Sequence, residues 1–385
     1  MTPRVLLSCG EPSGDLYAGA LVRELRALAP GIDVFGLGGP HFTAAGGRAI
    51  VDYRGLSVTG LTEPFAKIPQ LLAARRRLVA SAVATRPDVF VPIDFWGFNF
   101  RLARGMKRQR IPVVYYISPQ LWATRPWRMK TMREIAKRVL VIFPFEEQIY
   151  RDAGVPGESV AFVGHPLVDL ARPAAPRAEF LVARGLRAAA PTVAVLPGSR
   201  PGEVEKMLPD LMAAASRIRA QVPGAQCLVA RAPNLNDALF DVVRAGQFPE
   251  TAIVIVDGDT DTVLASSDVA LTASGTATVQ AALHDTPMVI VYRVSPWTYR
   301  LGRHLLKVDT FGMVNLIAGR RIVPELIQDA FTPEAVAAEA VSMLTDRARA
   351  ARIREGLREV RERLGGAGAS RRAAEAILRV ATGTG

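Results

Sequence analysis

Cysteine and histidine are scarce in this chain of 385 residues, which has two cysteines and four histidines. Cys9 and Cys227 stand far apart, which excludes a disulfide framework, a zinc ribbon and an iron–sulfur cluster. We expect both to be small buried residues. The histidines lack metal-ligand spacing, so we predict no metal site, and we expect no bound cofactor.

Long apolar runs and an export signal are missing as well. No window approaches the roughly 18 to 20 apolar residues that a membrane span needs. The apolar stretch after Met1, Val5–Gly10, has the length of a strand rather than of a signal-peptide core. We therefore expect a cytoplasmic protein whose contact with a membrane is peripheral.

Acidic residues are too few to balance the basic ones, because 36 Asp and Glu face 48 Lys and Arg, for a net charge of +12. This excess predicts an anionic partner, whether nucleic acid, an anionic membrane or a phosphorylated substrate, unless it reflects composition alone. Near the C-terminus, Arg354 to Arg363 alternate with glutamates. That mixture is typical of a solvated helix rather than of a nucleic-acid-binding arm.

Short apolar runs, each followed by a helical pattern, recur along the whole chain. Such runs predict an α/β protein with parallel sheets covered on both faces. In the first half they are Val5–Cys9, Val34–Leu37, Val89–Asp94, Val113–Ser118, Val139–Phe143 and Val160–Val163. In the second half they are Thr192–Leu196, Gln226–Ala230, Ala252–Val256, Val269–Ala273 and Met288–Tyr292.

Two series of runs in one chain predict two Rossmann-like, doubly wound domains that face each other across a cleft. The segment 171–191 is rich in alanine, proline and arginine and lacks a strand pattern, so we place the linker near 166–175. Residues 1–168 then form the N-terminal domain. Residues 169–385 form the C-terminal domain with a helical tail.

The first apolar run ends in Gly10–Asp15, where two glycines, a serine and carboxylates stand between a strand and a helix. Open α/β sheets bind ligands at such loops, so Glu11, Ser13 and Asp15 are candidate binding residues. Helix capping by Ser13 or Asp15 is the alternative. The glycine spacing is not that of a dinucleotide-binding loop.

Asp94 follows a strongly apolar run and precedes Phe95, Trp96, Phe98 and Asn99. Aromatic neighbours would raise the pKa of this carboxyl and make it a better proton acceptor. The aromatic residues also suggest a pocket for an apolar group. The alternative is an aspartate that caps the following helix.

Two turns in the second half have the composition of anion sites, with backbone N–H groups at a helix start favouring phosphate. Arg200 adds a fixed positive charge to the first turn. Two such turns in one domain point to a diphosphate ligand such as a nucleotide sugar. The candidate residues are Gly198, Ser199, Arg200, Glu203, Ser274, Gly275 and Thr276.

His165 ends the last run of the first half, close to the linker. It is either a catalytic base or a hinge histidine bonded to the backbone.

The segment 56–80 combines apolar residues with a basic end, which suits a surface that dips into lipid headgroups. The candidate membrane residues are Phe65, Ile68, Leu71, Leu72, Arg75, Arg76 and Arg77. The alternative is a core-facing helix with a basic end. Pro64 and Pro69 argue against a single long helix.

Taken together, the motifs resemble those of the lipid-A-disaccharide synthase family, in the family's order and over nearly the whole chain. They are the segments 10–15, 93–99, 116–123, 143–146, 164–166, 196–205, 273–277, 315–320 and 324–328. The resemblance implies a metal-independent inverting glycosyltransferase of the GT-B fold. It would join UDP-2,3-diacylglucosamine to 2,3-diacylglucosamine 1-phosphate at the inner face of the cytoplasmic membrane, giving the β-1,6-linked disaccharide 1-phosphate and UDP.

The resemblance also implies residue roles. Asp94 matches the family's essential aspartate, a base for the acceptor 6-hydroxyl, and Ser13 and Arg200 join it as candidate catalytic residues. The acceptor side comprises Glu11, Ser13, Asp15, Phe95 and Asn99. The donor side comprises Gly198, Ser199, Arg200, Glu203, Ser274, Gly275, Thr276, Gln280 and Asn315.

Two positions depart from the family's pattern. Gln280 stands where a glutamate that can hold ribose hydroxyls is usual, so a charged acceptor is lost. Ala123 follows Trp122 where a second tryptophan is common.

The main alternative is another UDP-sugar enzyme of the same fold, either an epimerase or a soluble glycosyltransferase. A basic nucleic-acid-binding protein is the other, and the acids interleaved among the C-terminal arginines argue against it. We expect no nucleic-acid partner, and the sequence leaves self-association open.

Overall fold

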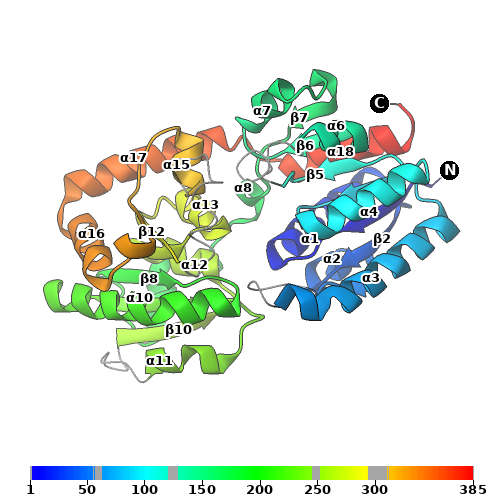
Figure 1. Ribbon diagram of the computed structural model, residues 1–385. Coiled ribbons are helices and arrows are strands. Elements are labelled where there is room, and N and C mark those ends of the chain that lie inside the picture. The colour runs from blue at the N-terminus through cyan, green and yellow to red at the C-terminus, as the bar shows by residue number, and fades with distance from the viewer. Residues whose placement is uncertain are drawn as a thin grey trace. The chain divides into compact units, whose positions relative to one another are not determined.

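The computed structural model describes residues 2–54, 56, 63–119, 129–244, 252–293, 310 and 312–384. The chain forms two compact units. The first comprises Met1–Asp169 together with Leu364–Gly385, and the second comprises Leu170–Arg363. Each unit has a parallel sheet with helices packed on it (Figure 1).

The first unit contains four parallel strands in the order β3-β2-β1-β4, with three further parallel strands in the order β5-β6-β7. Bridges from Phe90 to Val113 and from Ile93 to Tyr116 connect β4 to the β5 segment. The strand order reverses between β1 and β4, and such a reversal is where α/β sheets bind ligands. The strands are β1 (Arg4–Ser8), β2 (Asp33–Gly38), β3 (Arg48–Asp52), β4 (Val89–Pro92), β5 (Val114–Tyr116), β6 (Arg138–Val141) and β7 (Val160–Phe162).

The helices of the first unit bury apolar side chains against its sheet. Residues of α3, α4 and α6 form one buried cluster with Leu6, Phe90 and Tyr115 of the strands. Helix α1 packs against α18. The helices are α1 (Pro12–Leu28), α2 (Pro40–Ala44), α3 (Glu63–Thr85), α4 (Trp96–Arg108), α6 (Met129–Ile135), α7 (Glu146–Asp152), α8 (Leu167–Leu170) and α18 (Ala369–Ala381).

Helix α18 corrects the domain boundary expected from the sequence, which placed residues 169–385 in the C-terminal domain. Its segment, Leu364–Gly385, belongs to the first unit, where α18 packs on α1, β4 and β5, whereas α16 and α17 remain in the second unit. Its apolar face, with Ala373 and Ile377, is fully buried. The carboxylate of Asp169 accepts hydrogen bonds from the backbone N–H groups of Gly368 and Ala369, which ties the start of α18 to this unit.

The second unit has a six-stranded parallel sheet in the order β10-β9-β8-β11-β12-β13. Its strand order reverses between β8 and β11. The strands are β8 (Thr192–Leu196), β9 (Gln226–Arg231), β10 (Ile253–Asp257), β11 (Val269–Ala273), β12 (Met288–Tyr292) and β13 (Glu325–Ile327). The helices are α9 (Arg177–Val182), α10 (Pro201–Gln221), α11 (Asp241–Arg244), α12 (Thr260–Ala265), α13 (Thr276–Leu283), α15 (Met313–Ala318), α16 (Pro333–Thr345) and α17 (Arg347–Arg363). Short 3-10 turns lie at Gly157–Ser159 in the first unit and at Asp237–Phe240 and Gln328–Ala330 in the second.

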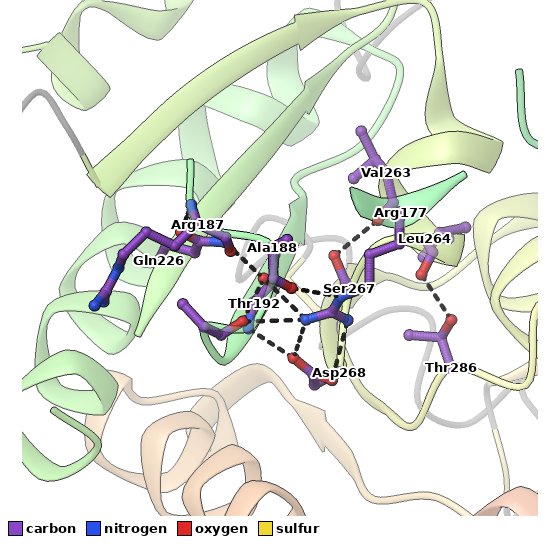
Figure 2. Close-up of polar contacts among 11 residues, drawn as sticks. Arg177, Arg187, Ala188, Thr192, Gln226, Val263, Leu264, Ser267, Asp268 and Thr286 are labelled. Atoms are coloured by element: carbon purple, nitrogen blue, oxygen red, sulfur yellow. Dashed lines mark hydrogen bonds and ion pairs between the residues drawn. The ribbon is translucent and has the colours of Figure 1, made fainter. Parts of the chain in front are cut away.

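Polar contacts at the amino ends of the second unit's strands hold α9 against its sheet (Figure 2). The guanidinium of Arg177 donates two hydrogen bonds to the carboxylate of Asp268, at 3.1 and 2.9 Å. Asp268 also accepts from the backbone N–H of Thr192, the first residue of β8. The side-chain amide of Gln226 donates to the Thr192 hydroxyl at 3.0 Å. These bonds pair polar groups at the edge opposite to the carboxyl ends of the strands.

The α/β class with two Rossmann-like sheets is confirmed. Each of the eleven predicted runs overlaps a strand, whereas β3 and β13 were not predicted. Both are edge strands with little buried surface, so they lack a continuous apolar run. No helix in the described parts of the chain is both long and apolar enough to cross a membrane.

Both cysteines lie in buried positions, as expected. Burial raises the pKa of the Cys227 thiol to about 12 and that of Cys9 well above its ordinary value. Neither thiol is therefore ionised near neutral pH.

Candidate active site

Asp94 stands at the carboxyl end of β4, beside the point where the strand order reverses. It is exposed, so the aromatic residues that follow do not enclose it as the sequence suggested. Its backbone is left-handed, with φ of 39°, and Phe95 follows with φ of 47°. Two consecutive non-glycine residues in this region store strain, and such strain marks positions where the chain presents a functional side chain.

Asn99, in the first turns of α4, holds this strained turn in place. Its side chain is fully buried, and its Nδ2 donates to the carbonyl oxygens of Ser8, Ile93 and Asp94, the last at 2.8 Å. Its Oδ1 accepts from the Ser8 hydroxyl at 2.6 Å. These bonds occupy its polar atoms, so Asn99 is not available to bind an acceptor as the sequence suggested. It joins the ends of β1 and β4 and positions Asp94.

Asp15 is likewise a structural residue rather than the ligand-facing one expected. Its carboxylate is fully buried and accepts hydrogen bonds from three backbone N–H groups at the start of α2. The donors are Gly39, His41 and Phe42, at 2.7 to 3.1 Å. Asp15 therefore caps a helix, as the alternative from the sequence held. The helix that it caps is α2, however, and not α1, in which Asp15 itself lies.

Ser13 and Glu11 remain partly exposed at the start of α1. The hydroxyl of Ser13 makes no hydrogen bond within the part of the chain that the structure describes, and it caps no helix. Glu11 is the N-cap residue of α1 by position, although its side chain accepts no capping bond. Both side chains stay at the edge of the sheet where a ligand can meet them.

Phe95 fills the space between the Gly10 turn and α4. A Cβ atom at position 10 would stand 2.2 Å from the Phe95 ring, so only glycine allows this approach. The ring also packs 5.4 Å from that of Phe98. Phe95 therefore connects the turn at Gly10, after β1, with the turn at Asp94, after β4. Its side chain is half-buried between them and does not line an open pocket.

The first loop of the second unit follows β8. Gly198 has φ of +120°, and a Cβ there would stand 2.6 Å from Oε2 of Glu203, so this turn requires glycine. Glu203 folds back over the loop: Oε2 accepts from the Ser199 N–H at 3.3 Å, and Oε1 pairs with Arg200 at 3.1 Å. Ser199 and Arg200 are both exposed. The loop thus presents a guanidinium and a hydroxyl at the start of the 21-residue helix α10.

The second loop follows β11, on the other side of the same strand-order reversal. Gly275 and Thr276 are exposed and Ser274 is half-buried, at the start of α13. Because β8 and β11 are neighbouring parallel strands, their loops emerge at the same sheet edge. The structure therefore brings the two predicted donor loops together.

Gln280 contacts Asp261, a candidate site residue that the sequence did not identify. Its Nε2 donates to Oδ1 of Asp261 at 3.1 Å, and the same oxygen lies 2.9 Å from Nε2 of His284. Asp261 stands in α12 and keeps part of its carboxylate exposed. A carboxylate is therefore present beside position 280, although residue 280 itself is an amide. Nothing in the linear spacing from Asp261 to Gln280 marked this contact.

Asn315 is buried and bonded to the chain, unlike the sugar-facing residue expected. Its Nδ2 donates to the Val323 carbonyl at 3.0 Å and to Oε1 of Glu325 at 2.6 Å. Its Oδ1 accepts from the N–H groups of Ile322 and Val323. Asn315 orders the segment between α15 and β13, and its amide has no capacity left for a ligand.

Helix α3 carries the residues predicted to meet a membrane. Large apolar side chains are exposed at Ile68 (43%), Leu72 (43%) and Val83 (54%), and Arg75, Arg76 and Arg77 are exposed beside them. Leu71 differs, because it is partly buried against the core. The side chain of Phe65 lies outside the described residues, as do Gln120–Trp122 and Ala123. Pro69 is accommodated inside α3, so the two prolines did not divide this helix.

Ser8 was also missed. Its buried hydroxyl, at the last position of β1, bonds to Asn99. A polar residue at the end of an apolar strand is the signal that could have identified it. Among the described residues, no group of three or more His, Cys, Asp or Glu side chains is arranged to hold a metal ion.

The sequence profile of the lipid-A-disaccharide synthetase family matches residues 5–380. The lipid-A-disaccharide synthase of Myxococcus xanthus (strain DK1622) is 42% identical over 376 residues, covering 98% of this chain and 97% of that protein. The lipid-A-disaccharide synthase of Koribacter versatilis (strain Ellin345) is 44% identical over 383 residues, covering 98% of both.

Solved structures with low sequence identity share the fold. The UDP-GlcNAc 2-epimerase of Neisseria meningitidis bound to UDP-GlcNAc has a TM-score of 0.66 at 10% identity, covering 98% of this chain and all (100%) of that chain. The glycotransferase of kitacinnamycin has a TM-score of 0.64 at 19% identity, covering 98% and 99% of the two chains. At these identities the likeness extends to the fold alone.

Proposed function

Because the chain belongs to the lipid-A-disaccharide synthase family, we propose that it joins UDP-2,3-diacylglucosamine to 2,3-diacylglucosamine 1-phosphate. The chain is a glycosyltransferase of lipid A biosynthesis with a GT-B fold. The observation that carries the proposal is the family match across residues 5–380. The products are the β-1,6-linked disaccharide 1-phosphate and UDP.

The reaction is a displacement with inversion at the anomeric carbon of the donor. The acceptor 6-oxygen forms the new bond to this carbon, while the bond to the UDP oxygen breaks and UDP leaves with the electron pair. The hydroxyl proton passes to Asp94, whose exposed carboxylate sits on a backbone fixed by Asn99. Ser13, at the same sheet edge, is suited to bind the acceptor.

The leaving UDP accumulates negative charge on its diphosphate. Arg200 offers a guanidinium at the start of α10, and the loop at Ser274–Thr276 adds hydroxyls and N–H groups on the neighbouring strand. Preorganised donors of this kind stabilise charge that develops in the transition state. In the structure Glu203 pairs with the Arg200 guanidinium at 3.1 Å. A bound diphosphate would take the place of Glu203 as a partner of Arg200.

The test measures UDP release from UDP-2,3-diacylglucosamine with and without the monosaccharide 1-phosphate acceptor. We expect release that depends on the acceptor and yields a disaccharide product by mass spectrometry. UDP release independent of the acceptor, or conversion of the donor to an epimer, would instead favour the other UDP-sugar enzymes of this fold.

Membrane contact through α3 is a second part of the proposal, at the inner face of the cytoplasmic membrane. Three of the four large apolar side chains that are exposed among the described residues lie on this helix. In the described chain no ion pair neutralises Arg75, Arg76 or Arg77. Arginines of α17 differ, since Arg358 and Arg361 pair with acids. Exposed apolar groups beside unneutralised arginines suit an anionic lipid surface.

Vesicle flotation can test this contact with the double variant Ile68→Ser/Leu72→Ser. We expect reduced binding to vesicles that contain phosphatidylglycerol, with full activity on substrates dispersed in detergent. Val182→Ser is the matched control, because Val182 is the fourth exposed apolar residue and lies in the second unit. Equal flotation of the double variant and the control would remove α3 from the membrane contact.

A further inference from the structure

His165 lies just beyond β7 and is only 2% exposed. Its ring meets the edge of Tyr17 at 6.0 Å between centroids and lies 5.4 Å from Phe143. Tyr17 belongs to α1, one turn beyond Ser13, and Phe143 follows β6. The imidazole therefore sits at the carboxyl edge of the first unit's strands, against the helix that starts with the Gly10–Gly14 loop.

Three hydrogen bonds tie His165 to the backbone of other residues, as the alternative from the sequence predicted. Its backbone N–H donates to the carbonyl of Leu364 at 2.8 Å and its carbonyl accepts from the N–H of Val168 at 3.0 Å, while its ring Nδ1 accepts from the N–H of Leu167 at 3.1 Å. Because Nδ1 accepts, it carries no proton, and the proton of the neutral ring stands on Nε2. Burial lowers the pKa of His165 to about 3, so the ring is neutral at physiological pH.

The Nε2–H group has no partner within the described residues. The ring is almost fully buried, and a buried donor without a partner is unfavourable. A buried N–H donor whose orientation is set by the Leu167 bond, at a ligand-binding sheet edge, is therefore suited to an oxygen atom of a ligand.

We propose that the Nε2–H of His165 donates a hydrogen bond to a hydroxyl or phosphoryl oxygen of the acceptor sugar phosphate. This inference rests on the proposed function for the identity of the ligand. It assigns His165 as a binding residue and excludes it as the general base. Nδ1 is occupied by Leu167, and Nε2 already carries a proton, so neither nitrogen can take one from the substrate.

Long-range ¹H–¹⁵N correlation spectra of the full chain test the tautomer directly. Four histidines are present, and the signal that disappears in His165→Asn identifies the residue. We expect the Nε2–H tautomer, without titration from pH 5.5 to 8, and a shift of Nε2 when the acceptor is added without donor. An Nδ1–H tautomer, an imidazolium, or an unchanged Nε2 signal would overturn the proposal.

Two substitutions separate the donor role from a structural one. His165→Asn places an oxygen near Nδ1 for the Leu167 N–H but removes the Nε2–H donor. His165→Gln does the reverse, because its amide nitrogen lies near the position of Nε2. We expect His165→Asn to lower kcat/KM for the acceptor about 10- to 100-fold with little change in Tm. His165→Gln should keep kcat/KM within about fivefold while Tm falls.

A purely structural histidine would make activity follow Tm in both variants, which contradicts the proposal. Failure of the proposed function is distinguishable, because the wild-type chain would then show no acceptor-dependent UDP release. An active wild-type chain with an equally active His165→Asn variant would overturn the His165 inference alone.

Discussion

The carboxyl edges of the two sheets have the same architecture and opposite chemistry. In each unit the strand order reverses at the edge that carries the predicted loops. The first unit presents the carboxylate of Asp94 there, whereas the second presents the guanidinium of Arg200 together with hydroxyls. A carboxylate can accept the proton of an attacking hydroxyl group, and a cation can stabilise the negative charge of a leaving diphosphate.

Both units also use a buried asparagine to support their functional segments. Asn99 and Asn315 are at most 1% exposed, and each spends both ends of its amide on neighbouring groups of the chain. From this comparison we propose that exposed residues at these edges carry the chemistry and that buried amides set its geometry. The following substitutions test that division, beginning with the largest expected effect.

Asp94→Asn keeps the size of the side chain and removes the proton acceptor. We expect kcat to fall about 10³- to 10⁴-fold with an unchanged Tm, because the loss of a general base costs this much and the side chain is exposed. Steady-state assays and thermal unfolding measure the two quantities. Asp152→Asn, another exposed aspartate of the first unit, is the control and should retain full activity. Rates near the wild-type value in Asp94→Asn would remove Asp94 as the base.

Arg200→Ala removes the cation from the corresponding edge of the second unit. We expect kcat/KM for the UDP-sugar to fall about 10²- to 10³-fold, since one preorganised donor to the developing charge is lost. Arg358→Ala is a matched control, because Arg358 pairs with Glu355 at 3.2 Å much as Arg200 pairs with Glu203 at 3.1 Å. Equal losses in both variants would show that the effect is structural.

Asn99→Ala breaks the support rather than the chemistry. It leaves the buried Ser8 hydroxyl and the carbonyl of Ile93 without their partner, so we expect the free energy of unfolding to fall by about 2 to 4 kcal/mol. We also expect kcat to fall about 10- to 100-fold as the Asp94 turn relaxes. Asn236→Ala, at the exposed cap of a 3-10 turn, should cost about 1 kcal/mol at most and leave kcat unchanged. An active and fully stable Asn99→Ala variant would contradict the positioning role.

Asp268→Asn addresses the opposite edge of the second sheet, where polar contacts support only the fold. The ion pair with Arg177 is about one-third exposed, so we expect a loss of about 1 kcal/mol and a Tm lower by about 2 to 4 °C. Calorimetry measures this change, and kcat should remain at the wild-type value. A large loss of kcat at unchanged Tm would show that Asp268, at the amino ends of the strands, takes part in catalysis, and would contradict the division between the two sheet edges.

The strand pattern and the positions of the loops were predictable because both are local. An apolar run such as Val89–Pro92 must be buried on both faces, and the polar residue that follows it must stand at a sheet edge. Two edge strands escaped prediction, since β3 and β13 bury little and show no continuous apolar run, whereas the edge strands β7 and β10 were predicted. The position of α18 was not predicted either. Its sequence shows an apolar helix face but does not show which of the two sheets this face packs against.

The sequence alone determined the two Rossmann-like sheets, the loops that carry Asp94 and Arg200, and the family. Only the tertiary structure decided which polar residues are free for a ligand. Asp15, Asn99 and Asn315 have the composition of binding residues, yet hydrogen bonds to backbone groups of other segments occupy their polar atoms. The physical reason is that a buried polar group must find its partners within the fold, and only the tertiary packing decides which of these side chains are buried.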